Sequence, residues 1–171
     1  YYTMQYAAKI GPRGAVYAFE PSPINFAQLT AACASGPTVT PLQMALGKSE
    51  GVLPFAQGAD TIGATSRIVA AADGASVDVQ VRPGAARIAE GGAKAPNLIK
   101  IDVEGFEPEV IEGLGEALHE PALRAIGIEV HFGLLRDRGM DDAPAALEKL
   151  LQAAGFAVRW TDASHLIAQR Q

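Results

Sequence analysis

Residues 98–109 read LIKIDVEGFEPE, and this stretch decides the fold. Apolar side chains at 99, 101 and 103 alternate with charged ones at 100, 102 and 104, which is the two-residue period of a β-strand. A glycine and a proline follow, and they predict a turn into a helix that begins near Pro108. Because ligands of open α/β sheets bind beyond the carboxyl ends of the strands, we expect Asp102 and Glu104 at the mouth of a site.

Helices and strands alternate before this stretch. Helical spacing predicts helices over residues 2–10 and 23–35, the second one capped by Ser22 and started by Pro23. Apolar runs predict strands at 15–19 and 39–46 and shorter ones at 52–55 and 77–81. Residues 58–75 are rich in glycine and alanine, so we expect them to form a surface excursion.

The same alternation continues after it. A short helix is expected within residues 83–92, and an apolar stripe predicts that the helix from Pro108 runs to Leu118. A buried strand is expected within 123–132, a helix capped by Asp142 follows, and residues 156–160 and 165–168 are predicted to form an antiparallel hairpin. This order predicts a mostly parallel α/β sheet covered by helices, with an antiparallel hairpin at its C-terminal end.

Composition narrows the class of protein. A chain of 171 residues with 49% apolar and 19% charged residues predicts one globular domain over residues 1–171. A net charge of −5 argues against nucleic acid as a partner, and a single cysteine, Cys33, excludes an internal disulfide framework and predicts a buried small side chain. There is neither a long apolar run nor a signal peptide, so we expect no membrane contact and a cytoplasmic location. The oligomeric state stays open.

Two further polar residues follow predicted strands. Glu20 ends the strand at 15–19, a position where a carboxylate commonly accepts hydrogen bonds from the ribose of a nucleotide-like cofactor, although a solvated glutamate fits equally well. His131 ends the strand that contains Glu129. If the two strands are parallel neighbours, Glu129 and His131 lie alongside Asp102 and Glu104. An unperturbed pKa of about 6.5 makes His131 a candidate general base, with a structural histidine as the alternative.

Four motifs in this order carry a family resemblance: residues 16–23 (VYAFEPSP), 45–47 (ALG), 99–107 (IKIDVEGFE) and 128–131 (IEVH). Together they resemble FkbM-type S-adenosylmethionine-dependent methyltransferases. The resemblance implies the Rossmann-like class I methyltransferase fold, whose sheet ends in an antiparallel strand. It also implies that Glu20, with Pro21 and Ser22, binds the cofactor ribose, that the segment containing Met44 and Ala45 lies beside the adenine, and that Asp102 lies near the methionine portion or the acceptor.

The resemblance implies methyl transfer from S-adenosylmethionine to a hydroxyl of a small molecule or sugar. We assign His131 as the base and count Asp102 and Glu104 as the other candidate catalytic residues. Lys100 is expected to pair with a neighbouring carboxylate. We assign no metal, with a divalent cation on Asp102, Glu104 and Glu129 as an alternative. A nicotinamide-dependent oxidoreductase and a non-catalytic binding or scaffold domain are the alternative functions.

One departure from the family concerns the start of the chain. The family's first strand and glycine-rich cofactor loop should precede a helix like that predicted at 2–10, and here nothing precedes it. We therefore interpret the chain as an N-terminally truncated methyltransferase domain, and we expect the fragment alone to bind S-adenosylmethionine poorly. A second departure is Pro83-Gly84, where the family usually has Leu-Asp.

Overall fold

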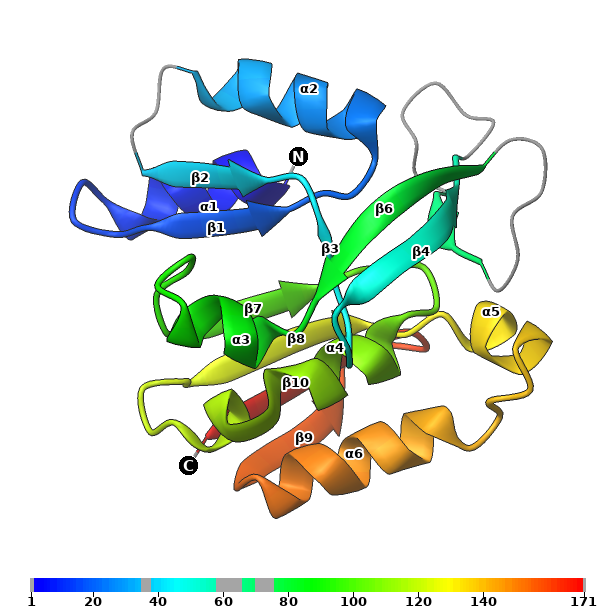
Figure 1. Ribbon diagram of the computed structural model, residues 1–171. Helices are drawn as coiled ribbons and strands as arrows, with labels where there is room; N and C mark the ends of the chain where they lie inside the picture. The colour runs from blue at the N-terminus through cyan, green and yellow to red at the C-terminus, as the bar shows by residue number, and fades with distance from the viewer. Residues whose placement is uncertain (1, 35–37, 58–65, 70–75, 171) are drawn as a thin grey trace. The chain divides into compact units, whose positions relative to one another are not determined.

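A computed structural model describes residues 2–34, 38–57, 66–69 and 76–170 of the chain (Figure 1). The chain divides into two compact units. The first comprises Tyr1–Ala45 and Gly51–Val81, and the second comprises Leu46–Glu50 and Arg82–Gln171. Most of the predicted surface excursion at 58–75 lies outside the described residues. No helix in the described part of the chain is both long enough and apolar enough to cross a bilayer.

The first unit begins with α1 (Tyr2–Ile10), β1 (Val16–Phe19), α2 (Pro23–Cys33) and β2 (Val39–Leu42). β1 and β2 are parallel, in register from Val16 opposite Val39 to Phe19 opposite Leu42. α2 packs on β2 and α1 on β1. The predicted start of α2 is confirmed, because the Ser22 hydroxyl accepts a hydrogen bond from the Asn25 N–H at 3.3 Å. Cys33 is buried, as predicted.

The strand predicted over residues 39–46 is wrong as a single element. β2 ends at Leu42, and a separate short strand, β3, spans Ala45–Leu46. The chain bends between them, where the Met44 N–H donates to the Leu42 carbonyl at 3.0 Å instead of to a neighbouring strand. The apolar pattern runs through the bend, so periodicity alone does not reveal it.

The first unit also holds the antiparallel strands β4 (Gly51–Ala56), β5 (Arg67–Ile68) and β6 (Ser76–Arg82, with its last residue in the second unit). β4 pairs with β6 from Gly51 opposite Val81 to Ala56 opposite Ser76, and on its other side it pairs with β5. Both short strands predicted in this region are confirmed, and each is longer than predicted. The prediction of one mostly parallel sheet holds only in part, because the described strands form three separate sheets and only some of their pairs are parallel.

The second unit is built on a sheet of order β7-β8-β10-β9, with β7 (Leu98–Ile101), β8 (Ala125–Glu129), β9 (Phe156–Trp160) and β10 (His165–Arg170). β7 and β8 are parallel, and β10 runs antiparallel to β8 and β9, which confirms the predicted hairpin. Its helical elements are α3 (Gly84–Ala89), α4 (Glu107–Leu114), the 3-10 helix η1 (Gly115–His119), α5 (Phe132–Asp137) and α6 (Ala143–Ala153).

Two boundaries, one short helix and one helix cap in the second unit differ from prediction. β7 stops at Ile101, two residues before the alternating pattern ends, and the helix predicted to reach Leu118 changes to the 3-10 helix η1 after Leu114. α5 was not predicted, because its six residues are too few to reveal a helical period. Asp142 occupies the N-cap position of α6, but its side chain makes no capping hydrogen bond.

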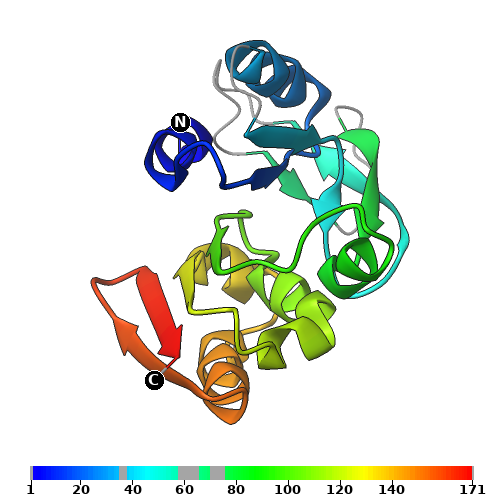
Figure 2. The same cartoon turned by 90° about the vertical axis from the view of Figure 1, so that its left-hand side faces the viewer.

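The core of the second unit lies between its sheet and its helices. Figures 1 and 2 show α4 and α6 on the same face of the sheet. The predicted inward-facing residues of β8 and its extension, Ile126, Ile128 and Val130, are at most 2% exposed. Ile111 of α4 and Leu151 of α6 are fully buried. Each such side chain contributes about 1.5–3 kcal/mol on burial, and this burial stabilises the packing of α4 and α6 in one core with the sheet.

The turn of the hairpin gives a pH prediction. One Asp162 carboxylate oxygen accepts hydrogen bonds from the backbone N–H groups of Ser164, at 2.9 Å, and His165, at 2.8 Å. These bonds and the contact with the His165 ring lower the pKa of Asp162 from 3.8 to about 2. The turn's contribution to stability is therefore present above the unfolded pKa and lost as the pH falls through about 2.

We expect the Asp162 carboxyl carbon to titrate near pH 2 in a ¹³C NMR experiment on the folded protein. The same carbon in urea-unfolded protein is the control and should titrate at the ordinary aspartate value. Equal midpoints in the two states would show that the turn does not hold the carboxylate.

Candidate functional site

The ends of β7 and β8 bring together the residues predicted for the catalytic site. The two strands are parallel and in register, with Ile101 opposite Ile128, so the residues that follow each strand emerge at the same edge. Asp102 and Glu104 follow β7, and His131 follows β8 directly after Val130. The prediction that Glu129 and His131 lie alongside the two carboxylates is therefore confirmed. We call Asp102, Glu104, Glu107, Glu129 and His131 the carboxylate–histidine cluster.

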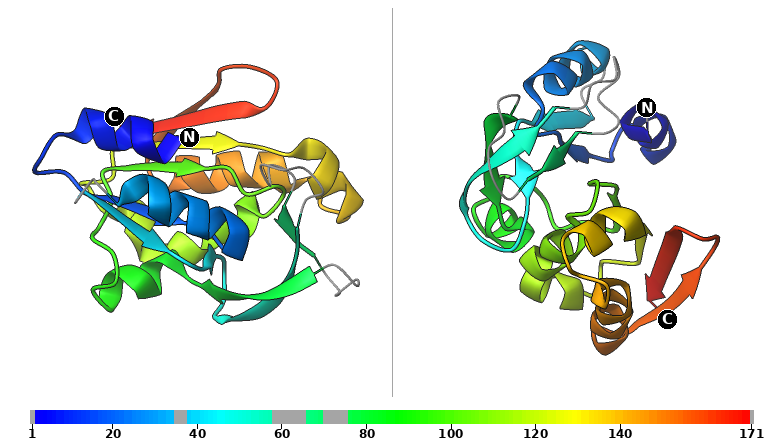
Figure 3. Two further views of the ribbon diagram at one scale, coloured as in Figure 1. Left: turned by 90° about the horizontal axis from the view of Figure 1, so that it is seen from above. Right: turned by 90° about the vertical axis from the view of Figure 1, so that its right-hand side faces the viewer.

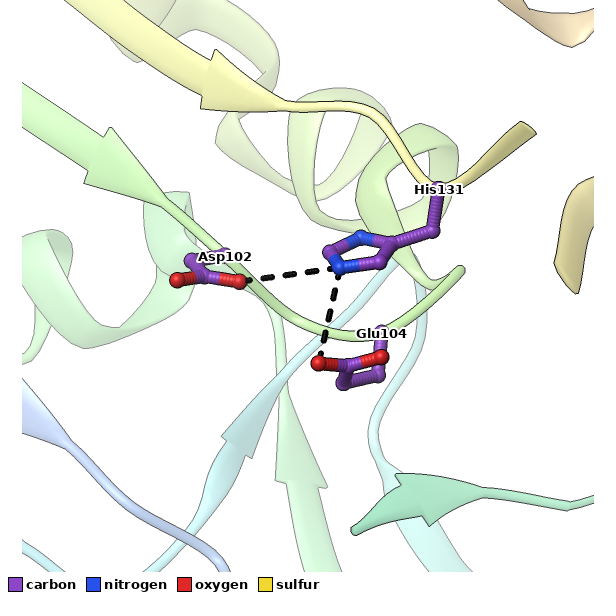
Figure 4. Close-up of side chains that lie close together, drawn as sticks. All are labelled: Asp102, Glu104 and His131. Atoms are coloured by element: carbon purple, nitrogen blue, oxygen red, sulfur yellow. Dashed lines mark ion pairs between the residues drawn. The ribbon is translucent and has the colours of Figure 1, made fainter. Parts of the chain in front are cut away.

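Figure 4 shows one nitrogen of the His131 ring facing both Asp102 and Glu104. Its Nε2 lies 3.4 Å from Glu104 Oε1 and 3.9 Å from Asp102 Oδ1. The other ring nitrogen, Nδ1, lies 2.8 Å from Glu107 Oε1, which is hydrogen-bonding distance. Nδ1 thus faces one carboxylate at hydrogen-bonding distance, and Nε2 faces two carboxylates that lie further away.

The backbone turn after β7 sets the direction of the Glu104 and Glu107 side chains. Glu104 has φ 51° and Gly105 has φ 88°, two consecutive left-handed residues that reverse the chain into α4. A non-glycine residue in this conformation costs about 1–3 kcal/mol and persists only where its surroundings hold it. Here Arg138 donates to the Gly105 carbonyl and to the Glu109 carboxylate, and its guanidinium lies 5.4 Å from the centre of the Phe106 ring. Figure 3 gives two further views of α5, which precedes Arg138.

The charges of the cluster shift its pKa values. The pKa of His131 is raised, chiefly by its hydrogen bond to Glu107, with burial acting against this. Burial raises the pKa of both Asp102 and Glu104, and the nearby carboxylates add to the shift. Lys100 opposes it at Asp102, where its Nζ lies 3.9 Å from Oδ2. The cluster as a whole favours a positive charge on the His131 ring.

The predicted cofactor-binding residues belong to the first unit. Glu20 directly follows β1, and its N–H donates to the Leu42 carbonyl at 3.0 Å, so the carboxyl ends of β1 and β2 meet. Met44 and Ala45 follow β2 at that edge. One Glu20 carboxylate oxygen accepts from the Ser22 N–H at 2.9 Å, and burial raises the pKa of Glu20. The Ser22 side chain is 2% exposed and engaged in capping α2, so Ser22 orients Glu20 through its backbone.

Comparison with known proteins identifies the family. Residues 1–158 match the family model described as the methyltransferase FkbM domain. The chain belongs to the FkbM methyltransferase domain family. This confirms the resemblance drawn from the motifs and favours the methyltransferase over the oxidoreductase alternative.

Two similar proteins are informative. The hexuronic acid methyltransferase AglP of Haloferax volcanii is 30% identical over 161 residues, which cover 91% of this chain and 62% of AglP. The crystal structure of methyltransferase FkbM from Methylobacillus flagellatus KT matches with a TM-score of 0.59 at 15% identity, over 91% of this chain and 36% of that one. At 15% identity, the second match supports the fold alone. The two coverages show that the chain spans less than two thirds of either relative.

A divalent metal ion is the alternative occupant of the carboxylate–histidine cluster. Asp102, Glu104 and His131 each offer one ligand atom, and these atoms lie within 4.8 Å of one another. Carboxylate and imidazole groups suit several divalent cations. Glu129, which the sequence-based alternative included, instead faces Lys100 Nζ at 3.8 Å and His165 Nε2 at 3.3 Å. The first contact confirms the predicted pairing of Lys100 with a carboxylate.

Sequence reasoning missed one member of the cluster. Glu107 was not among the predicted site residues, but it is 0% exposed and contacts His131, 24 residues further along the chain. No local spacing signals such a contact.

A cavity of about 330 Å³ between α4 and α6, lined by Pro108, Met140 and Leu147 among others, includes none of the cluster residues. We place the site at the cluster because the reactive groups converge there.

Proposed function

We propose that the protein transfers a methyl group from S-adenosylmethionine to a hydroxyl of a sugar or another small molecule, with residues 1–171 as its methyltransferase domain. The observation that carries this proposal is the position of His131 Nε2, which faces Asp102 and Glu104 beyond the ends of two parallel strands. Membership of the FkbM family supports the reaction class. AglP, a hexuronic acid methyltransferase, supports a sugar as acceptor.

The donor fits the residues of the first unit. Glu20 presents a half-buried carboxylate, oriented by the Ser22 N–H, which can accept hydrogen bonds from the two ribose hydroxyls. Pro21, Met44 and Ala45 complete the proposed contacts with the cofactor, and Asp102 is proposed to lie near its methionine portion or the acceptor. When bound, S-adenosylmethionine supplies an electrophilic methyl group on a sulfonium.

The residues of the second unit would prepare the acceptor. A hydroxyl becomes a good nucleophile only as it loses its proton, and His131 Nε2 is the group placed to receive that proton. Asp102 and Glu104 can accept hydrogen bonds from neighbouring hydroxyls and so orient a sugar ring. Correct orientation alone can lower such a barrier by about 7–11 kcal/mol.

The charge of the cluster favours a hydroxyl over a carboxylate as the reacting group. Asp102, Glu104 and Glu129 lie at this edge, and Lys100 is their permanent counter-charge among the described residues, so a further carboxylate at the reacting position beside neutral His131 would be repelled. A carboxylate also needs no base, because it carries no proton at neutral pH. On a hexuronic acid we therefore expect methylation of a ring hydroxyl.

The test is a methyl-transfer assay with the full-length protein, methyl-labelled S-adenosylmethionine, and hexuronic acids beside the corresponding neutral hexoses. We expect an alkali-stable methyl ether. An alkali-labile methyl ester would contradict both the hydroxyl acceptor and the base. If the protein binds S-adenosylmethionine but labels no acceptor in the panel, the non-catalytic alternative is favoured.

Glu20→Gln tests the donor site. A hydrogen bond to a charged group contributes about 1.5–3 kcal/mol, so loss of the charge should weaken S-adenosylmethionine binding about 10- to 150-fold. Isothermal titration calorimetry on the full-length protein measures this. Glu112→Gln is the matched control, because Glu112 is a surface carboxylate paired with Lys48. Unchanged affinity in Glu20→Gln would remove Glu20 from the donor site.

A further inference from the structure

Glu107 is a charged side chain that is buried without any role in the reaction described above. Its exposed fraction is 0%, and Ser22 is the other buried polar residue in the described part of the chain. Removing an ionised carboxylate from water costs several kcal/mol unless hydrogen bonds and an opposite charge offset the loss. The contacts of Glu107 therefore have to account for its position.

Glu107 contacts the backbone of the turn before α4 and the ring of His131. Glu107 Oε1 accepts the Gly105 N–H at 2.9 Å and faces His131 Nδ1 at 2.8 Å, while Oε2 has no hydrogen-bond partner among the described residues. Glu107 is also the first residue of α4, where the helix dipole stabilises a negative charge. The backbone thus fixes the carboxylate, and the carboxylate fixes the imidazole.

The two nitrogens of the ring are held unequally. Nδ1 is at hydrogen-bonding distance from a buried carboxylate, whereas Nε2 is 3.4 and 3.9 Å from carboxylates whose side chains are 24% and 35% exposed. Electrostatic attraction is stronger where water is excluded. When the imidazolium loses one proton, the proton on Nε2 is therefore the one that leaves.

We propose that Glu107 is a positioning residue that keeps the proton of neutral His131 on Nδ1 and thereby presents the Nε2 lone pair to the acceptor hydroxyl. This inference rests on the proposed function. As the acceptor oxygen forms its bond to the methyl carbon, the bond from that carbon to the donor sulfur breaks, and the sulfonium would leave as a neutral thioether. The acceptor O–H bond breaks, the proton moves to Nε2, and the ring becomes an imidazolium cation. The negative charge of Glu107 stabilises that cation, and the methylated oxygen is left neutral.

The proposal predicts a pH signature. A protonated Nε2 cannot accept a proton, so kcat should rise as the pH passes upward through the pKa of His131. Glu107 raises that pKa, as do Asp102 and Glu104 to a lesser degree, and Lys100 and Glu129 lie next to Asp102. Glu107→Gln removes one negative charge, so the acidic limb of the kcat profile should move to lower pH.

The same variant should be slower at every pH on the plateau. The amide of glutamine can accept from Nδ1–H or donate to Nδ1, so it no longer selects the tautomer that exposes the Nε2 lone pair. General base catalysis contributes about 10²- to 10⁴-fold, and we expect a loss at the lower end of that range. KM for the acceptor should stay near the wild-type value, because Glu107 is buried behind the imidazole.

The deciding experiment is ¹⁵N NMR on wild-type protein labelled at histidine, and it does not depend on activity. Above the pKa of His131, we expect protonated Nδ1 and unprotonated Nε2. In Glu107→Gln the midpoint should fall, and in the control Glu112→Gln, a carboxylate on the same helix, it should not change.

Two results would overturn the proposal: neutral wild-type His131 with its proton on Nε2, or Glu107→Gln with the wild-type midpoint. The wild-type spectrum by itself shows which nitrogen of neutral His131 carries the proton, so the proposal is tested even if the variant does not fold. A failure of the base proposed for the reaction gives a different result. The tautomer would then be as expected, but His131→Ala would retain full methyl transfer.

Discussion

Replacing His131 with alanine is expected to lower kcat for methyl transfer by about 10²- to 10⁴-fold, the usual contribution of a general base. The variant loses the Nε2 that faces Asp102 and Glu104, so the acceptor proton has no positioned group to receive it. Affinity for S-adenosylmethionine should stay at the wild-type value, because none of the proposed donor contacts comes from His131. Steady-state kinetics and calorimetry on the full-length protein measure the two effects separately.

The matched control is His119→Ala, which removes an exposed histidine from η1 in the same unit. It should leave kcat unchanged. Equal activity of His131→Ala and wild type would exclude His131 as the base. Chelation separates the base from a metal ligand: wild-type activity should survive EDTA, and activity lost on chelation and restored by a divalent cation would instead indicate a metal on Asp102, Glu104 and His131.

Replacing Gly113 with alanine is expected to destabilise the protein by about 3 kcal/mol, at the upper end of the cost of overpacking. Gly113 lies in α4, and a Cβ there would be 1.9 Å from the Gly47 carbonyl oxygen and 2.7 Å from its carbon. Both atoms belong to the backbone, so a side-chain rotation cannot relieve the clash. Alanine's better helix propensity returns only about 1 kcal/mol, which the clash exceeds.

Thermal unfolding of Gly113→Ala should show a Tm about 6–12 °C below that of the wild type, given about 2–4 °C per kcal/mol for a chain of this size. Gly133→Ala in α5 is the control, because no neighbouring atom of the described residues lies within 4 Å of the position that its Cβ would take. That variant should be unchanged or slightly more stable. A wild-type Tm for Gly113→Ala would show that α4 does not approach the segment at Gly47 so closely.

Local sequence patterns predicted the elements whose boundaries carry their own chemical signals. The Ser22-Pro23 pair marks the start of α2, and alternation predicts β7 and β8 together with the polar residues beyond their ends. Elements without such a signal were missed or misplaced. α5 is too short to show a period, and the chain bends at Met44 although the apolar pattern runs on.

Sequence motifs were enough to recognise the family, because their identity and order along the chain are specific to it. Local patterns also predicted the strand-end positions of Asp102, Glu104 and His131 and the C-terminal hairpin, because each of these depends on residues close together in the chain. Only the tertiary structure decided which atoms of those residues meet. The 2.8 Å contact between Glu107 and His131 joins α4 to the end of β8 across 24 positions. Its existence depends on strand register and on the left-handed turn at Glu104 and Gly105, which no periodicity encodes.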